Sequence, residues 1–281
     1  MHMESDIFNK VSVQRHIYQH AVLWKPDFLN LHHLCTINAK NHLLPKEQLS
    51  ELVQHTTLAV NEEEASYLER STRGQASTPL WFEHRVGRIT ASVFGRVAKC
   101  LEKSFPTSLV KKIMQYSRSN TDVPAIKWGV KHEQEAREAY TNIMAVKHAT
   151  FKINPAGLRV CTKQPFLAAT PDGVVSCSCC SEGLLEIKCP FKYWNSPPAS
   201  IEDKSFYLHN VGSEVTLDKK HDYYYQVQGQ MAIWKKPYCD FICWTTKGLI
   251  ITWIQADGKF YEELRPLFEK IHPARTVDTK P

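Results

Sequence analysis

The chain has 281 residues, enough for one large domain or two ordinary ones, and is 43% hydrophobic and 23% charged. This composition is that of an ordinary globular protein, and no apolar run approaches the length of a membrane-spanning helix. The start of the chain is polar and acidic and lacks the features of a signal or transit peptide. Nine cysteines without a regular framework fit a reducing intracellular compartment better than secretion.

The net charge of +6 is unevenly distributed along the chain. Residues 1–70 hold 6 Lys and Arg against 9 Asp and Glu, whereas residues 71–281 hold 29 against 20. Within residues 81–118 two acids accompany eight bases, which are Arg85, Arg88, Arg96, Lys99, Lys103, Lys111, Lys112 and Arg118. A basic surface of this kind indicates a polyanionic ligand, and a solvated basic helix is the alternative.

The first part of the chain is predicted to be helical. Residues 1–70 are loosely amphipathic and carry no recognisable chemistry. The polar segment 71–79, with a glycine and a proline, is predicted to be a linker. Further helices are predicted over Thr90–Leu101, Thr107–Ser117 and Gly129–Val146. We therefore expect a helical N-terminal extension over 1–70 and one larger domain over 71–275.

Strands dominate the middle of the chain. Five short ones are predicted, over Thr150–Ile153, Gly157–Val160, Phe166–Ala169, Gly173–Ser176 and Leu184–Cys189. A long loop over 191–221 follows. The remaining predicted elements are a helix over Tyr223–Trp234, a hairpin of Cys239–Thr245 and Leu249–Trp253, and a helix over Phe260–Ile271. This order predicts an α/β fold, a mixed β-sheet core flanked by helices.

Two short segments, ATPDG at 169–173 and LLEIKCP at 184–190, carry most of the chemical information. Strand alternation places Glu186 and Lys188 side by side on one face, and Asp172 lies in a Pro-Asp-Gly turn that leads into the same hairpin. Two acids and a lysine at one sheet edge can hold a divalent metal and a water against a phosphodiester. An exposed Glu–Lys surface pair is the alternative.

Glu133 is a candidate third acid. It continues the stripe of Ala136, Tyr140 and Ile143, which the helical period predicts to be buried. A buried carboxylate must be paired, metal-bound or neutral. A role in the metal site is the preferred interpretation, and an i,i+4 ion pair with Arg137 is the alternative.

Other candidate residues lie on two further helices. Gln226 stands in an apolar helix, where its amide either holds a water or phosphate oxygen or satisfies a backbone group. Arg85 and Ser92 flank the predicted start of the helix at Thr90, and a guanidinium, a hydroxyl and free helix N–H groups together form an anion site. Trp81 either stacks on a base or anchors the chain to the core.

Three cysteines, Cys177, Cys179 and Cys180, lie at the predicted tip of the hairpin. Their C-x-C-C spacing lacks two separated C-x2-C pairs and has no matching histidine pair. The spacing therefore does not favour a structural zinc site.

Five motifs occur in a characteristic order: WFEHRVGRITAS from Trp81, WG at 128–129 with Glu133, ATPDGVV, LLEIKCP and YYYQVQGQM. In this order the chain resembles the YqaJ viral recombinase domain, of the phage lambda exonuclease-like family of PD-(D/E)XK nucleases. The resemblance covers residues 72–255 and leaves residues 1–70 outside. The cysteine-rich tip at 177–180 and the long loop at 191–221 depart from the family pattern.

The resemblance implies a restriction-endonuclease-like fold and phosphodiester hydrolysis that depends on Mg2+ or Mn2+. It implies a 5′→3′ exonuclease acting on duplex DNA with a free 5′ end. A homo-oligomer such as a trimer is a further expectation, as is a location inside the cell, in the nucleus or cytoplasm and away from membranes. The alternatives are a structure- or single-strand-selective nuclease on DNA or RNA, and a non-catalytic nucleic-acid-binding module derived from a mobile element.

The resemblance also implies roles for single residues. Asp172 and Glu186 match the metal-binding acids, and we expect the backbone carbonyl of Ile187 beside them. The remaining matches are Glu133 as the helix acid at or beside the metal, Lys188 as the catalytic lysine, Gln226 as the active-site glutamine, Arg85 and Ser92 as the pair that holds a 5′-phosphate, and Trp81 as the aromatic residue near it.

Overall fold

The fold is known from a computed structural model, which describes residues 59–100, 106–116, 122–212 and 214–271. Most of the predicted N-terminal helical region, residues 1–58, lies outside the described residues. Across the described ranges, no helix has both the length and the apolar character required to cross a membrane.

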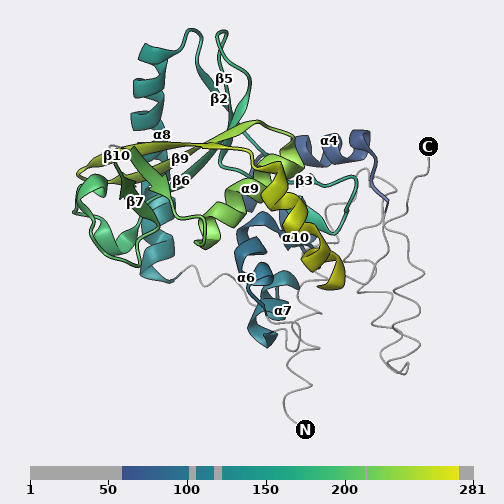
Figure 1. The fold of residues 1–281 in the computed structure, drawn as a ribbon. Coiled ribbons are helices and arrows are strands. Elements are labelled where there is room, and N and C mark those ends of the chain that lie inside the picture. Colours follow the sequence, from purple (N-terminus) through teal and green to yellow (C-terminus); the bar gives the residue numbers. More distant parts are fainter. Residues whose placement is uncertain (1–58, 101–105, 117–121, 213, 272–281) are drawn as a thin grey trace.

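The elements follow one another as helices first, then mostly strands, then alternating helices and strands (Figure 1). The α-helices are α4 (Glu62–Ser71), α5 (Pro79–Glu83), α6 (Phe94–Ala98), α7 (Thr107–Ile113), α8 (Pro124–Lys147), α9 (Asp222–Trp234) and α10 (Gly258–Ile271). The strands are β1 (Ile89–Thr90), β2 (Lys152–Asn154), β3 (Arg159–Val160), β4 (Leu167–Ala169), β5 (Gly173–Ser176), β6 (Gly183–Lys188), β7 (Leu208–Val211), β8 (Glu214–Leu217), β9 (Tyr238–Thr245) and β10 (Gly248–Gln255). Short 3-10 turns are η1 (Gln75–Ser77), η2 (Ala91–Val93), η3 (Phe191–Tyr193) and η4 (Pro198–Ser200).

The main sheet has the strand order β10-β9-β6-β5-β2. Strands β6 and β9 are parallel, and the other neighbours are antiparallel. Helices α8 and α9 pack on this sheet through alternate residues of β6: Leu185 contacts the cluster around Tyr140 of α8, and Leu184 contacts the cluster around Val227 of α9. Because neighbouring strand residues face opposite sides, the two helices cover opposite faces. The predicted α/β class, a mixed sheet flanked by helices, is confirmed.

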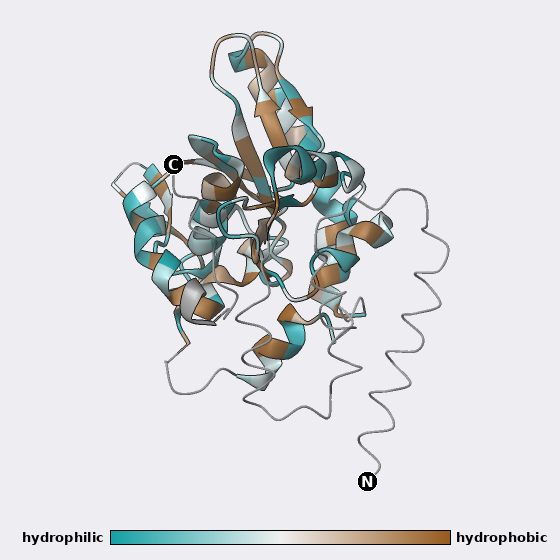
Figure 2. Cartoon of the chain, turned by 90° about the vertical axis from the view of Figure 1, so that its right-hand side faces the viewer, coloured by the Kyte–Doolittle hydropathy of each residue, from teal (hydrophilic) through white to brown (hydrophobic). Residues whose placement is uncertain are grey.

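The hydropathy of the chain follows these layers. In Figure 2 the central strands are largely hydrophobic, whereas hydrophilic and hydrophobic stretches alternate along the helices that surround them. This is the pattern of amphipathic helices packed on a buried sheet.

A smaller sheet, in the order β1-β4-β3, is covered by α4. Residues Ala65 and Leu68 of α4 pack against Leu158, Val160 and Ala168 of this sheet region. The last residues of the predicted N-terminal region therefore pack on the same body as the strands.

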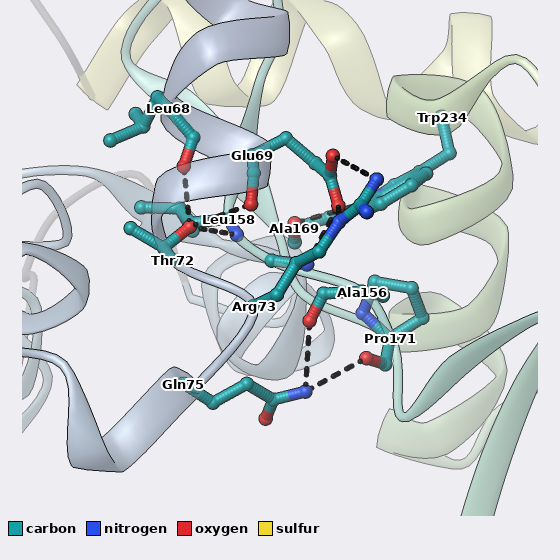
Figure 3. Close-up of polar contacts among 11 residues, drawn as sticks. Leu68, Glu69, Thr72, Arg73, Gln75, Ala156, Leu158, Ala169, Pro171 and Trp234 are labelled. Carbon is teal, nitrogen blue, oxygen red and sulfur yellow. Dashed lines mark hydrogen bonds and ion pairs between the residues drawn. The ribbon is translucent and has the colours of Figure 1, made fainter. Parts of the chain in front are cut away.

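The segment predicted to be a linker is held on the core by hydrogen bonds (Figure 3). The hydroxyl of Thr72 donates to the Leu68 carbonyl at 2.7 Å and accepts the Leu158 N–H at 2.7 Å. The side-chain amide of Gln75 donates to the carbonyls of Ala156 at 3.1 Å and Pro171 at 3.3 Å. The prediction of a linker over 71–79 is wrong, because these polar residues serve as hydrogen-bond partners for distant backbone.

Two other predicted elements differ from the structure. The helix expected from Thr90 begins only at Phe94, because Ile89 and Thr90 pair in parallel with β4 and a 3-10 turn follows. The region 191–221, predicted to be a loop, contains the β7–β8 hairpin. Strand pairing determines the conformation of both segments, and local sequence patterns do not indicate that pairing.

Candidate active site

The end of β6 carries the predicted acid and lysine in direct contact. The Lys188 ammonium donates to Oε1 of Glu186 at 2.5 Å, so both side chains lie on one face of the strand as predicted. Glu186 is only 2% exposed. The alternative of an exposed surface pair is therefore wrong, and an acid this deeply buried must be held by hydrogen bonds.

Helix α9 supplies those hydrogen bonds. The Gln226 side-chain amide donates to Oε1 of Glu186 at 2.5 Å, and the Gln230 amide donates to Oε2 at 2.8 Å. Sequence reasoning selected Gln226 and missed Gln230. The signal was present, because the two residues are four apart on one helix and therefore share a face.

Asp172 lies beside β6 just before β5. Its backbone N–H donates to the Leu185 carbonyl at 3.0 Å, and its Oδ2 accepts the Ile187 N–H at 2.7 Å. Burial raises the pKa of Asp172 well above its usual range, and the Glu186 carboxylate adds to the rise. Burial and a neighbouring carboxylate thus both disfavour the charged form of Asp172, which a bound cation would favour.

Lys188 supplies part of the compensating positive charge. Burial alone would lower its pKa, but the carboxylates of Glu186 and Asp172 outweigh burial, and the pKa of Lys188 is raised. Its Nζ also lies 4.7 Å from the centre of the Tyr223 ring. The ammonium therefore stays protonated, which suits electrostatic positioning and does not suit proton abstraction.

Glu133 forms the ion pair that was the alternative interpretation. Its Oε1 lies 3.0 Å from a guanidinium nitrogen of Arg137, which also donates to the Asp172 carbonyl at 3.0 Å. The Glu133 side chain is 44% exposed, so its placement on the buried stripe is wrong.

The buried stripe of α8 includes two of the predicted positions, Ala136 and Tyr140, and its third buried residue is His132. His132, Ala136 and Tyr140 are buried, whereas Ile143 is 36% exposed. The face of α8 that packs on the core therefore lies next to Glu133. Glu133 itself lies at the edge of that face, on the side of Asp172.

A cavity of about 300 Å³ lies between the start of α8 and the end of β6. Glu133, Asp172, Ile187, Lys188 and Tyr223 are among the residues that line it. Among the described residues, the three predicted acids do not bring their oxygens within 4.8 Å of one another as a group. The cavity nevertheless gathers carboxylate donors next to a charged lysine, and hard oxygen donors of this kind fit Mg2+ or Mn2+.

Trp81 connects the predicted phosphate-binding segment to this site. Its indole N–H donates to the Thr170 hydroxyl at 3.1 Å, and the Arg85 guanidinium lies 4.0 Å from the ring centre. The Thr170 carbonyl in turn accepts from Gln230 at 3.3 Å. Trp81 is thus anchored to the core, as one of the two interpretations predicted. Its ring also packs against the Arg85 guanidinium.

Arg85 belongs to a group of neighbouring cations. Burial lowers the pKa of Arg85 to about 10. Burial also lowers the pKa of Lys112, and the nearby positive charges of Arg96 and Arg85 lower it further. This group of cations, which also has the Asp222 carboxylate near Lys112, is a candidate place to bind an anion.

Two of the residues predicted to be basic surface or anion-binding residues, Arg88 and Ser92, do not belong to the group of cations around Arg85. Arg88 is 1% exposed and donates to the carbonyls of Pro165 at 2.9 Å and His84 at 2.7 Å, so it is a buried structural residue. Ser92 is exposed in η2, with its hydroxyl 3.2 Å from that of Thr90. It precedes the five-residue helix α6, so the expected long helix with a capping hydroxyl is absent here.

The order of these elements along the chain matches one family. The YqaJ-like viral recombinase domain matches residues 80–246. The chain belongs to this family. The segment of Trp81, the acid hairpin and α9 all lie within the matched residues. No curated protein matches the chain.

Three solved structures show some likeness to this chain, and the titles of two of them name an exonuclease. An alkaline exonuclease (LHK-Exo) from Laribacter hongkongensis has a TM-score of 0.48 and 21% identity, over 69% of this chain and 91% of that chain. A SOX–DNA complex has a TM-score of 0.48 and 13% identity, over 79% and 70%. The shutoff and exonuclease protein of Kaposi's sarcoma-associated herpesvirus has a TM-score of 0.46 and 12% identity, over 74% and 70%.

Proposed function

We propose that this protein is a metal-dependent deoxyribonuclease, acting as a 5′→3′ exonuclease on duplex DNA ends. The observation that carries the proposal is the buried Glu186, which is hydrogen-bonded by Lys188, Gln226 and Gln230 next to Asp172. A structural role alone does not require three donors on one acid beside a second, destabilised acid. Membership of the YqaJ family agrees with this activity.

Asp172, Glu186 and the Ile187 carbonyl would hold a divalent cation, with Glu133 at or beside it. When bound, Mg2+ or Mn2+ supplies charge neutralisation at the phosphate and lowers the pKa of a bound water. The raised pKa of Asp172 supports this assignment, because burial and the nearby Glu186 carboxylate disfavour its charged form, which a bound cation would favour.

The other side chains would position the reacting groups and stabilise the charge that develops on the phosphate. Gln226 and Gln230 fix the orientation of the Glu186 carboxylate. The protonated Lys188 would hold the attacking water and stabilise the negative charge that develops on the phosphate. Arg137 would fix the position of Glu133 relative to the Asp172 backbone through its two hydrogen bonds.

Specificity for a 5′ end is assigned to Arg85, Ser92 and the cations next to Arg85. A terminal phosphate carries more charge than an internal one and would gain most from Arg85, Arg96 and Lys112. Trp81 would keep Arg85 in place. An intracellular location, in the nucleus or cytoplasm, fits a substrate of this kind.

The test compares digestion of three duplexes with Mg2+: linear with 5′-phosphate, linear with 5′-hydroxyl, and a closed circle. We expect the phosphorylated linear duplex to be digested fastest and the circle to stay intact. Arg85→Ala should remove the preference for the phosphate and leave slow digestion. Equal cutting of circles would overturn the exonuclease assignment, and no digestion with Mg2+ or Mn2+ would favour a nucleic-acid-binding module.

A further inference from the structure

A second group of metal-ligating side chains lies at the opposite end of the hairpin from Glu186. It consists of His148, Cys177, Cys179 and Cys180, whose ligand atoms all lie within 4.8 Å of one another. His148 directly follows α8, and the three cysteines follow β5 at the tip of the β5–β6 hairpin. We propose that these four residues form a structural zinc site, which takes Zn2+ as a Cys3His centre.

The fold brings the four residues together through the pairing of β2 with β5. Lys152 is paired with Ser176, so the residues before β2 run antiparallel to those after β5. The Ala149 carbonyl continues this pairing by accepting the Ser178 N–H at 3.1 Å. Figure 1 shows the end of α8 beside β2 and β5 at one extremity of the molecule. The site is therefore held by backbone hydrogen bonds independently of any ion.

The distances fit a tetrahedron around zinc. The sulfurs of Cys177, Cys179 and Cys180 lie 3.7, 3.4 and 3.5 Å from Nδ1 of His148. The sulfur of Cys179 lies 3.4 Å from that of Cys177 and 3.9 Å from that of Cys180. Tetrahedral zinc with ordinary bond lengths gives edges of about 3.6 Å for sulfur to nitrogen and about 3.8 Å for sulfur to sulfur.

Neither a hydrogen-bond cluster nor a disulfide explains the arrangement. One imidazole nitrogen takes part in one hydrogen bond as acceptor or donor, yet three thiols converge on Nδ1 of His148. The sulfur–sulfur distances of 3.4 and 3.9 Å exceed the roughly 2.05 Å of a disulfide. Three thiolates and an imidazole are soft and borderline ligands, which select zinc over Mg2+.

The position of the site indicates a structural role. All four ligands come from the protein, so no position is open for substrate or water. His148 directly follows α8 and lies fifteen residues after Glu133, which corresponds to roughly 22 Å along the helix. Bound zinc would join the far end of α8 to the hairpin whose other end carries Asp172 and Glu186, and would thus limit movement between the elements that carry the acids.

The experiment measures zinc in the full chain, purified under reducing conditions without added metal. We expect about one zinc per chain in the wild type and in Cys100→Ser, a matched cysteine outside the cluster. Cys180→Ser and His148→Ala should lose at least about tenfold in zinc affinity. Glu186→Gln should keep its zinc, which separates this site from the proposed catalytic one.

Cobalt substitution of the wild type covers the case in which a variant fails to fold. Tetrahedral thiolate coordination would give intense visible d–d bands together with thiolate-to-cobalt charge-transfer bands. Equal zinc content in Cys180→Ser and the wild type would overturn the proposal. Absence of zinc from the wild type, together with absence of tetrahedral cobalt bands, would overturn it as well.

Discussion

The two ends of the β5–β6 hairpin present opposite kinds of ligands to a metal ion. At the inner end, carboxylates line a cavity next to a charged lysine and two glutamine amides. At the outer end, three thiols and an imidazole lie within tetrahedral distance of one another. Helix α8 contributes to both ends, through Glu133 and through its C-terminal neighbour His148.

With both proposed ions bound, one scaffold would keep a reacting metal apart from a structural one. Oxygen ligands in a cavity leave room for water and a phosphate, whereas a closed sulfur and nitrogen set leaves none. Because the ligand classes prefer different ions, Mg2+ should go to the inner end and zinc to the outer end. Substitutions at the inner end should therefore leave the zinc content of the outer end unchanged.

The largest effect is expected for Glu186→Gln. The substitution keeps the shape but removes the charge that would hold the cation, so digestion of linear duplex should fall by about 10³-fold. Binding of duplex in the absence of metal should persist, because the cations next to Arg85 are untouched. Glu138→Gln, an exposed acid on α8, is the matched control and should keep full activity. Activity of Glu186→Gln near that of the control would exclude Glu186 from the site.

Lys188→Arg should lower the turnover by about 10²-fold, because a planar guanidinium cannot occupy the position of the ammonium. The raised pKa of Lys188 further predicts that the activity shows no rise with pH that reports deprotonation of this lysine. Lys192→Arg, at an exposed lysine paired with Asp203, is the control. Near-wild-type rates for Lys188→Arg would contradict the positioning role.

A smaller, roughly tenfold loss of kcat is expected for Gln230→Leu, with the KM for DNA nearly unchanged. Gln230 acts through Glu186, so it is a positioning residue. Gln228→Leu is the matched control, because Gln228 is equally buried but forms hydrogen bonds with the Gln255 carbonyl and the Asp257 N–H. That variant should lower the melting temperature and spare kcat. The opposite pattern would show that the two glutamines have been assigned the wrong roles.

The smallest effect concerns the stability of the protein without Mg2+. The folded chain binds a proton at Asp172 more tightly than the unfolded chain, since the pKa of Asp172 is raised in the folded state. The carboxylate therefore destabilises the fold progressively as the pH rises above the ordinary carboxyl range toward the raised value. Asp172→Asn should raise the melting temperature at neutral pH, by about 2–4 °C per kcal/mol of free energy gained.

Mg2+ should then stabilise the wild type and leave Asp172→Asn nearly unchanged. Thermal unfolding at several pH values, with and without Mg2+, measures both effects. A lower melting temperature for Asp172→Asn at neutral pH would mean that the carboxylate is stabilised by its surroundings, which would contradict the raised pKa of Asp172.

The inner end was largely predictable from the sequence because its signals are local. Alternation along β6 placed Glu186 and Lys188 together, and the β9–β10 hairpin followed from two apolar runs around Lys247 and Gly248. Gln226 stood out in an apolar helix. Gln230 was not selected, although it shares a helix face with Gln226, and the ion pair of Glu133 with Arg137 was considered only as the alternative interpretation.

The outer end was not predictable because its fourth ligand is distant in sequence. His148 precedes Cys177 by 29 residues, and only the pairing of β2 with β5 brings them together. The helix expected at Thr90 failed for the same reason, since pairing with β4 extends that residue. The β7–β8 hairpin lacks strong apolar alternation, so its strands could not be recognised from the sequence.

The most direct test of the account is digestion of 5′-phosphorylated linear duplex by wild-type protein whose zinc content is measured in the same sample. We predict that protein with its zinc retained and no Mg2+ leaves the duplex intact, and that added Mg2+ starts digestion without changing the zinc content. Digestion without Mg2+, or none with either Mg2+ or Mn2+, would contradict the assignment of the carboxylate end as the catalytic centre.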